Sequence, residues 1–321
     1  MRVLSTFTRF AHATVGSAAN GTGKTYATKV CELFVGLGLM VQISGNGRPD
    51  DVFDEPRSGR LAAWGNAVLG GFGSPDDAGT AIRGRDDGHR VVGLPDGGTG
   101  GTTDGGAAAD TGVAPGFAIG ALRALGVTGF RLALPAPGHP LGLTGPAGFN
   151  EQALAVGEAV LTVGRTTLGL LPEVQLVGPP GDRLTRVFWR VQPVAEGVPA
   201  DVPQLRDAER ELAQGLRDAT ATLMRLDVAG GGPAVQRALE AYRRRNQPML
   251  LAPGYPPRAV RVLESARQVR ALLSLASASE GAAVSAGEMA ARAEAIRPLD
   301  RIARRAQVAA YNALVDEPVR D

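Results

Sequence analysis

A short stretch near the start of the chain has residue types and a spacing that suit phosphate binding. Residues 18–25 read AANGTGKT, in which a small residue and four others precede Gly-Lys-Thr. In loops of this kind the glycines let backbone N–H groups converge on phosphate oxygens, while the lysine reaches the outer phosphates and the hydroxyl binds Mg²⁺. On this pattern Gly21, Gly23, Lys24 and Thr25 are the candidate nucleotide-binding residues; our cofactor prediction is none, and the alternative is Mg-ATP or Mg-GTP.

Two features that usually accompany such a loop are missing from the sequence. Residues 11–15 make a poor candidate for the buried strand that should lead into the loop. No run of four apolar residues ends in an aspartate, which the second, metal-supporting motif of such proteins requires. The competing interpretation is an ordinary glycine-rich entry, without a cofactor, to the helix that the apolar spacing of residues 25–39 predicts.

A second candidate is His139, which lies in the proline-rich turn of residues 135–140. A histidine fixed on a rigid turn after a strand is well placed for acid–base chemistry, and Glu158 and Glu173 are candidates to orient it. The alternative is an exposed loop histidine without a catalytic role. We therefore assign no catalytic residue from the sequence.

Metal-binding patterns do not occur in the sequence. The three histidines lie far apart, and neither Cys-x-x-Cys nor His-Glu-x-x-His is found, so no metal site is predicted. The single cysteine, Cys31, excludes an internal disulfide and is typical of a reducing compartment.

The composition favours a folded protein without a general affinity for nucleic acid or membranes. Hydrophobic residues make up 44% of the 321 residues, and the net charge is +2. A charge this close to neutral gives little attraction to nucleic acid, and the arginines at 243–245 and 301–305 alternate with acidic residues. The uncharged stretch at residues 33–47 is too short and too rich in glycine to span a bilayer. We predict a cytoplasmic protein with no nucleic-acid or membrane partner.

The hydrophobic periodicity predicts an α+β fold with an N-terminal α/β part and a small mixed sheet, a central strand meander and a C-terminal helical part. Helices are expected at 60–72, 118–125 and 149–156, and strands at 90–94, 129–134, 159–163, 167–177 and 184–194. From Asp201, which is expected to cap the first helix of the C-terminal part, the chain reads as a series of amphipathic helices. Pro298 is expected to break one of them.

These patterns divide the chain into four regions. Residues 1–94 form an N-terminal α/β region, and residues 95–115 form a glycine-rich loop or linker that has almost nothing to bury. Residues 116–200 form a central α/β region with the strand meander. Residues 201–321 form a C-terminal helical region.

Several short motifs after residue 116 resemble a group of uncharacterised proteins from actinobacteria. The motifs are LPAPG at 134–138, GFN at 148–150, GEAV at 157–160, GLLPE at 169–173, YPPR at 255–258 and RPLD at 297–300. The resemblance covers about residues 116–314 and implies a unit of unknown function, so no site residue carries over from it.

Two hypotheses about function follow. The leading one is a soluble, non-catalytic interaction or scaffold protein with an unknown protein partner, because amphipathic helices are abundant and catalytic constellations are missing. The alternative is a P-loop nucleotide-binding protein or weak NTPase that uses residues 18–25.

Overall fold

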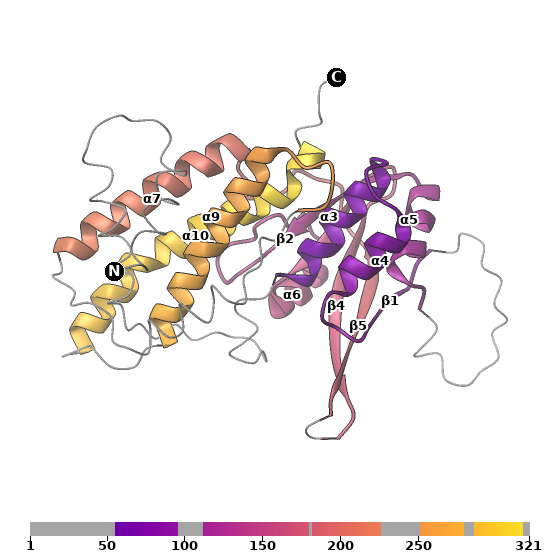
Figure 1. Ribbon diagram of the computed structural model, residues 1–321, viewed down its shortest axis with the longest axis horizontal. Coiled ribbons are helices and arrows are strands. Elements are labelled where there is room, and N and C mark those ends of the chain that lie inside the picture. Colours follow the sequence, from indigo (N-terminus) through magenta and orange to yellow (C-terminus); the bar gives the residue numbers. More distant parts are fainter. Residues whose placement is uncertain (1–54, 96–111, 180–181, 226–250, 279–285, 317–321) are drawn as a thin grey trace, which may run out of the picture. The chain divides into compact units, whose positions relative to one another are not determined.

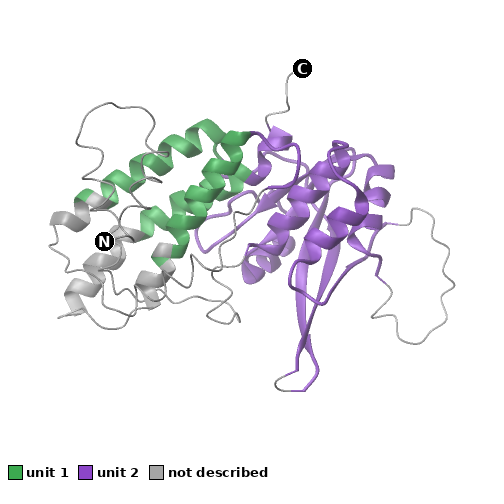
Figure 2. Cartoon of the chain, viewed as in Figure 1, with its two compact units in different colours: residues 1–54, 203–249, 257–310 green, residues 55–202, 250–256, 311–321 purple. Residues whose placement is uncertain are grey.

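The computed structural model describes residues 55–95, 112–179, 182–225, 251–278 and 286–316. The chain divides into two compact units, which Figure 2 colours separately. Of the described residues, those within 55–202 and the short segments 251–256 and 311–316 belong to an α/β unit. Those within 203–225, 257–278 and 286–310 belong to a helical unit.

A five-stranded mixed sheet forms the centre of the α/β unit (Figure 1). Its order is β1-β5-β4-β3-β2, with β1 parallel to β5 and every other neighbouring pair antiparallel. The predicted meander is confirmed as β3–β4–β5, and the α+β class with it. The strands are β1 (Gly88–Val92), β2 (Val127–Ala133), β3 (Ala159–Gly164), β4 (Leu168–Val177) and β5 (Leu184–Pro193).

Helices cover the two faces of this sheet unequally. On one face α3 (Arg57–Leu69) packs closely on β2, so that a Cβ at Gly65 would lie 2.5 Å from the Phe130 ring. The helices α4 (Pro75–Arg83) and α5 (Pro115–Ala124) pack beside it. The opposite face carries α6 (Ala147–Val156), whose Phe149 shares an apolar cluster with Leu161 and Leu171. Side chains alternate between the two faces along each strand, so Phe130 points to α3, whereas Leu161 and Leu171 point to α6.

Two asparagine side chains close the outer edge of β2. Asn66 accepts from the Phe130 N–H at 2.7 Å and donates to the Phe130 carbonyl at 2.8 Å. Asn312 forms the same pair of bonds with Leu132, at 2.7 and 3.2 Å. Both amides are buried, so they take the place of a neighbouring strand for an edge that would otherwise leave polar groups unsatisfied.

The helical unit contains α7 (Leu205–Arg225), α9 (Pro257–Ala278) and residues 286–310 of α10 (Ala286–Asp316). Gly215 of α7 faces α10, because a Cβ there would lie 2.8 Å from Ile302. The apolar stripe predicted for this helix is buried at Leu205, Ala208, Leu212 and Ala219, and Leu216 is half-buried. This confirms the helical C-terminal part.

Three local expectations were wrong or incomplete. Pro298 lies inside the continuous helix α10 rather than at a break, since the burial of α10 from Leu299 onward offsets the loss of one backbone hydrogen bond. Asp201 does not cap α7: it has a positive φ of 58°, and the Gln204 carbonyl accepts the first helical bonds. The sequence analysis also missed α4, although Ser74 caps it and a proline opens it.

Parts of the predicted division into regions fall within the described residues. The strand β1, from the predicted N-terminal region, pairs with β5 of the predicted central region in one sheet. In the predicted linker, Val113 pairs with Val91 and Pro115 begins α5, whereas residues 96–111 lie outside the described ranges.

Candidate functional site

The predicted nucleotide-binding residues Gly21, Gly23, Lys24 and Thr25 lie outside the described residues, so their predicted role remains a prediction. His139 is described. Its backbone N–H and carbonyl pair with Ala136 at 2.8 and 2.9 Å in the turn after β2, and its side chain is half-buried.

The two carboxylates expected near His139 have other partners. Glu173 accepts from Arg190 Nε at 2.7 Å on the β4–β5 hairpin. Glu158 Oε2 accepts from the Ser58 backbone N–H at 2.8 Å, at the start of α3. Neither forms a hydrogen bond with His139 among the described residues, so the structure does not bring these three side chains together.

A different histidine lies in a buried charged cluster. Asp86, in the turn before β1, accepts from both Nε and Nη2 of Arg57, at 2.9 and 2.8 Å, and from Arg60 Nη2 at 3.1 Å. Its Oδ2 also lies 2.9 Å from Nε2 of His89 on β1. On the far side of the imidazole ring, Trp189 Nε1 donates to His89 Nδ1 over 3.2 Å.

These contacts fix the protonation of His89. Because the indole N–H is only a donor, Nδ1 must accept, and the single proton of the neutral ring then lies on Nε2 and points to Asp86. Burial lowers the pKa of His89, and its hydrogen bond to Asp86 offsets this only in part. Burial alone would raise the pKa of Asp86, but hydrogen bonds from His89 and Arg57 outweigh it and hold this pKa below its usual range.

An aspartate–histidine pair resembles the orienting half of a catalytic triad, but here the second nitrogen is occupied. In a triad that nitrogen faces a nucleophile or substrate. In this protein it faces Trp189, whose side chain is fully buried. The cluster therefore joins α3, β1 and β5 as a structural network.

The amino end of α3 carries a further carboxylate. Glu158 satisfies one of the free backbone N–H groups there and lies near Arg57 and Arg60. Burial raises its pKa, and the Ser58 hydrogen bond and both arginines act in the opposite direction. Glu158 thus stabilises the start of the helix on which the Asp86 cluster depends.

A cavity of about 130 Å³ opens beside β3, lined by residues that include Arg131, Thr144 and Glu196. It is smaller than the roughly 300–1,000 Å³ of sites for drug-sized ligands. Thr144 Oγ1 is buried there without a hydrogen-bond partner among the described residues, and Arg131 is bound to Asp316 at 2.8 Å. A space of this size and polarity suits ordered water.

Two other kinds of feature are absent from the described ranges. Within them, no group of three or more histidine, cysteine, aspartate or glutamate side chains is arranged to hold a metal ion. None of the helices in these ranges combines the length and the apolar character that a bilayer span requires.

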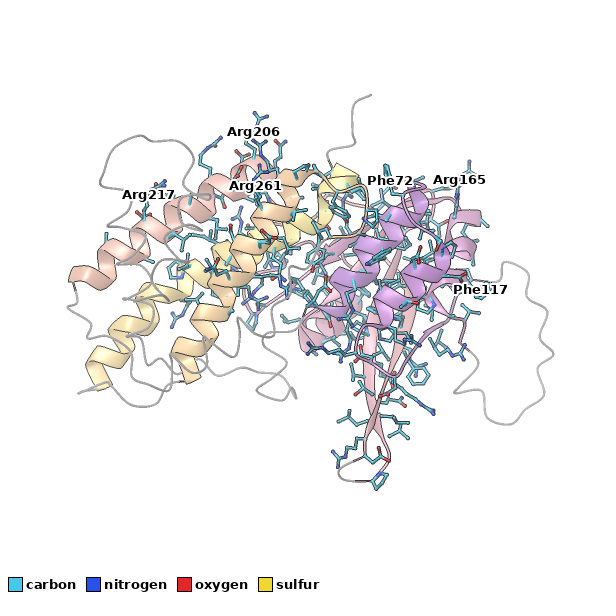
Figure 3. All side chains as sticks on the ribbon, in the orientation of Figure 1. Phe72, Phe117, Arg165, Arg206, Arg217 and Arg261 are labelled. Atoms are coloured by element: carbon cyan, nitrogen blue, oxygen red, sulfur yellow. The ribbon has the colours of Figure 1, made fainter. Side chains whose placement is uncertain are left out.

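The most exposed feature of the sheet is the outer half of the β4–β5 hairpin. Figure 1 shows this half extending beyond the other strands, and Figure 3 shows its side chains clear of the helices of the α/β unit. Four large apolar side chains there are 40–56% exposed: Val174, Leu176, Val177 and Leu184. Val174 and Leu176 lie on one face of the hairpin, and Val177 and its direct partner Leu184 lie on the other.

The face that carries Val177 and Leu184 continues inward as an open, basic part of the sheet. Arg186 and Arg190 of β5 lie on this face, and Arg90 of β1 pairs with Phe188 between them. All three arginines are exposed. We call these five residues, Val177, Leu184, Arg90, Arg186 and Arg190, the open face.

Only part of this surface was predictable from the sequence. It predicted the meander and therefore the hairpin. The open face depends on the parallel pairing of β1 with β5, and no local pattern specifies that pairing. The Asp86 cluster was missed as well, because Trp189 is separated from His89 by 100 positions; the aspartate three residues before a histidine was the only local signal.

Comparison with known proteins places most of the described chain in one group. A model of the Rv1486c-like protein, N-terminal domain, matches residues 58–205, and one of its C-terminal domain matches residues 206–308. An uncharacterised protein of Mycobacterium leprae is 30% identical over 207 residues, which are 58% of this chain and 68% of the relative. The uncharacterised protein Rv1486c of Mycobacterium tuberculosis is 29% identical over 218 residues, which are 62% and 74% of the two chains. No solved structure matches the chain.

These matches confirm the resemblance to uncharacterised actinobacterial proteins and extend it toward the N-terminus, to residue 58. The two models meet at residues 205 and 206, close to the boundary between the α/β and helical units at 202 and 203. Residues 18–25 lie outside both matches.

Proposed function

The chain belongs to the Rv1486c-like family, and we propose that it is a non-catalytic interaction protein that binds another protein chain through the outer half of the β4–β5 hairpin. The observation that carries the proposal is the apolar character of this exposed element. Val174, Leu176, Val177 and Leu184 are 42%, 56%, 40% and 43% exposed.

Isolated exposed apolar side chains are ordinary, but contiguous ones mark interaction sites. Val174, Leu176 and Val177 lie at the end of β4, and Leu184 begins β5. Val177 and Leu184 are direct cross-strand neighbours. A strand pair that only had to complete the fold would end near Val174 and Val187, because Val187 is the outermost buried side chain of the pair. The further length exposes apolar surface on both faces, and a partner chain would remove that surface from water.

The Asp86 cluster supports the non-catalytic part of this proposal. His89 is buried, and both of its ring nitrogens are bound to other side chains. The cavity beside β3 is small. The proposed cytoplasmic location and protein partner come from the sequence hypothesis. The binding experiment tests the protein partner.

Photo-cross-linking tests the proposal in the cells that produce the protein. Leu184 is replaced by p-benzoylphenylalanine, and the matched control carries the same replacement at Phe117, a residue of α5 that is 79% exposed (Figure 3). A covalent adduct with another polypeptide is expected from position 184 and not from 117. Equal adducts from both positions, or none from 184, would contradict the proposal.

A further inference from the structure

The open face differs in charge from the rest of the hairpin surface. Arg90, Arg186 and Arg190 lie together on neighbouring strands, because Arg90 is opposite Phe188 and the other two flank that residue in β5. Flanking positions of this kind lie within reach of long side chains across a strand pair. The apolar pair Val177 and Leu184 lies on the same face, farther out along the hairpin.

The positive charge of this face is only partly neutralised. Glu173 pairs with Arg190 at 2.7 Å. Arg186 forms no ion pair with any described residue, and Arg90 reaches only the Gly112 carbonyl, at 3.4 Å. Within the described part of the chain, no acidic side chain therefore pairs with these two guanidinium groups.

Within the α/β unit, this part of the sheet also lacks a covering helix among the described residues. On the opposite face, helices cover His89, Val91 and Trp189, and all three side chains are buried. The backbone of Val91 also pairs with that of Val113. On the open face α6 reaches β5 only near its end, where Gln152 accepts from Gln192 at 2.8 Å. Purely parallel sheets are normally covered on both faces, whereas mixed and antiparallel sheets such as this one can leave a face open to a partner or to water.

We propose that the open face binds an acidic, amphipathic segment of the partner protein, with apolar side chains against Val177 and Leu184 and carboxylates against Arg90 and Arg186. This inference rests on the proposed function and adds the chemistry of the partner. Guanidinium groups suit carboxylates because they bind both oxygens at once.

Nucleic acid is the less suitable occupant. Single-stranded nucleic acid is held by a basic surface together with aromatic rings on which bases stack. Phe188, the aromatic residue between Arg186 and Arg190, is only 5% exposed, and Trp189 points to the opposite face and is fully buried. The exposed hydrophobic side chains of this face are aliphatic.

Fluorescence anisotropy on the purified full-length protein tests the proposal. The probe is a labelled synthetic peptide with leucine at helical spacing on one side and glutamate at the remaining positions. The control peptide has lysine in place of every glutamate. The glutamate peptide is expected to bind, with an affinity that falls as salt is raised, and the lysine peptide is expected not to bind.

Charge-reversal variants test whether the glutamate peptide binds at the open face. The double variant Arg90→Glu/Arg186→Glu should lower the affinity for the glutamate peptide by about tenfold or more, because like charges then face each other. Arg165→Glu, a change of equal charge at an exposed arginine between β3 and β4 (Figure 3), should leave the affinity unchanged. Circular dichroism and the unfolding midpoint of each variant establish that it is folded.

Each of the following results would overturn the proposal. One is equal binding of the two peptides, and another is an equal loss of affinity in Arg165→Glu. The third is tighter binding of a labelled single-stranded RNA that is lost in the double variant, which would assign the surface to nucleic acid. If the glutamate peptide fails to bind while position 184 still cross-links to a protein, the interaction function stands and the acidic partner is wrong. If both fail, both proposals fall.

Discussion

At the scale of single residues, two kinds of polar side chain hold the α/β unit together. Asp86 binds two arginines at the start of α3 and is itself bound by His89, and Asn312 completes the edge of β2. Such roles were not predictable from the sequence, because each depends on a partner far along the chain. The predicted acid–base role of His139 depended on Glu158 and Glu173, which the fold directs elsewhere.

Replacing His89 should flatten the dependence of stability on pH. The folded state keeps this ring neutral because burial lowers its pKa, whereas the unfolded chain binds a proton there near pH 6.5. Stability is therefore lost as the pH falls from about 6.5 toward the folded-state pKa. Urea unfolding of the wild type and His89→Gln at pH 5, 6 and 7 measures the slope; an unchanged slope in the variant would contradict this role.

Replacing Asn312 with leucine should destabilise the protein strongly. The change leaves the Leu132 N–H and carbonyl buried without partners, at about 1–3 kcal/mol for each group. Chemical denaturation should show a loss of roughly 2–5 kcal/mol. Gln152→Leu, at an exposed amide on α6, is the control and should change stability by less than about 0.5 kcal/mol. Similar losses in both variants would contradict the closed edge.

At the scale of elements, periodicity located most helices and strands but not their pairing. The segments that became β3, β4 and β5 were readable as strands because short turns separate them. The helix α4 was overlooked within a glycine-rich and charged stretch, although Ser74 and Pro75 signal its start. Pro298 was expected to end a helix, and the surrounding packing instead preserves α10.

Shortening the β4–β5 hairpin should leave the fold intact. Because Gln175 and Arg186 are direct partners, an Asn-Gly turn can join them in place of residues 176–185. Among the residues removed, Leu176, Val177 and Leu184 are exposed and bury little. The thermal midpoint should shift by no more than about 2 °C. A fall of many degrees would show that the outer hairpin serves stability instead of binding.

At the scale of the whole molecule, the fold class was predictable and the interaction surface was not. A near-neutral chain with amphipathic helices and a strand meander indicates an α+β protein. The open face arises only when β1 joins β5 in parallel, which places Arg90 beside Arg186 although almost 100 positions separate them in the chain. Long-range pairing of this kind leaves no periodic signal in one sequence.

Nucleotide should not stabilise the protein if the interaction hypothesis is correct. The sequence offers Gly23, Lys24 and Thr25 for phosphate and magnesium, yet it lacks the metal-supporting aspartate motif. Addition of Mg-ATP or Mg-GTP is expected to leave the melting temperature unchanged. A magnesium-dependent rise that Lys24→Ala abolishes would instead make the phosphate-binding loop functional.

The most direct test of partner binding through the hairpin is the yield of the protein adduct from p-benzoylphenylalanine at position 184 in three backgrounds. In the otherwise wild-type chain and in Arg165→Glu, the adduct should form to the same extent. In Arg90→Glu/Arg186→Glu it should be strongly reduced, because the charges that hold the partner beside Leu184 are reversed. An adduct of undiminished yield in the double variant would contradict binding across the open face, and the lack of an adduct in every background would contradict partner binding through the hairpin.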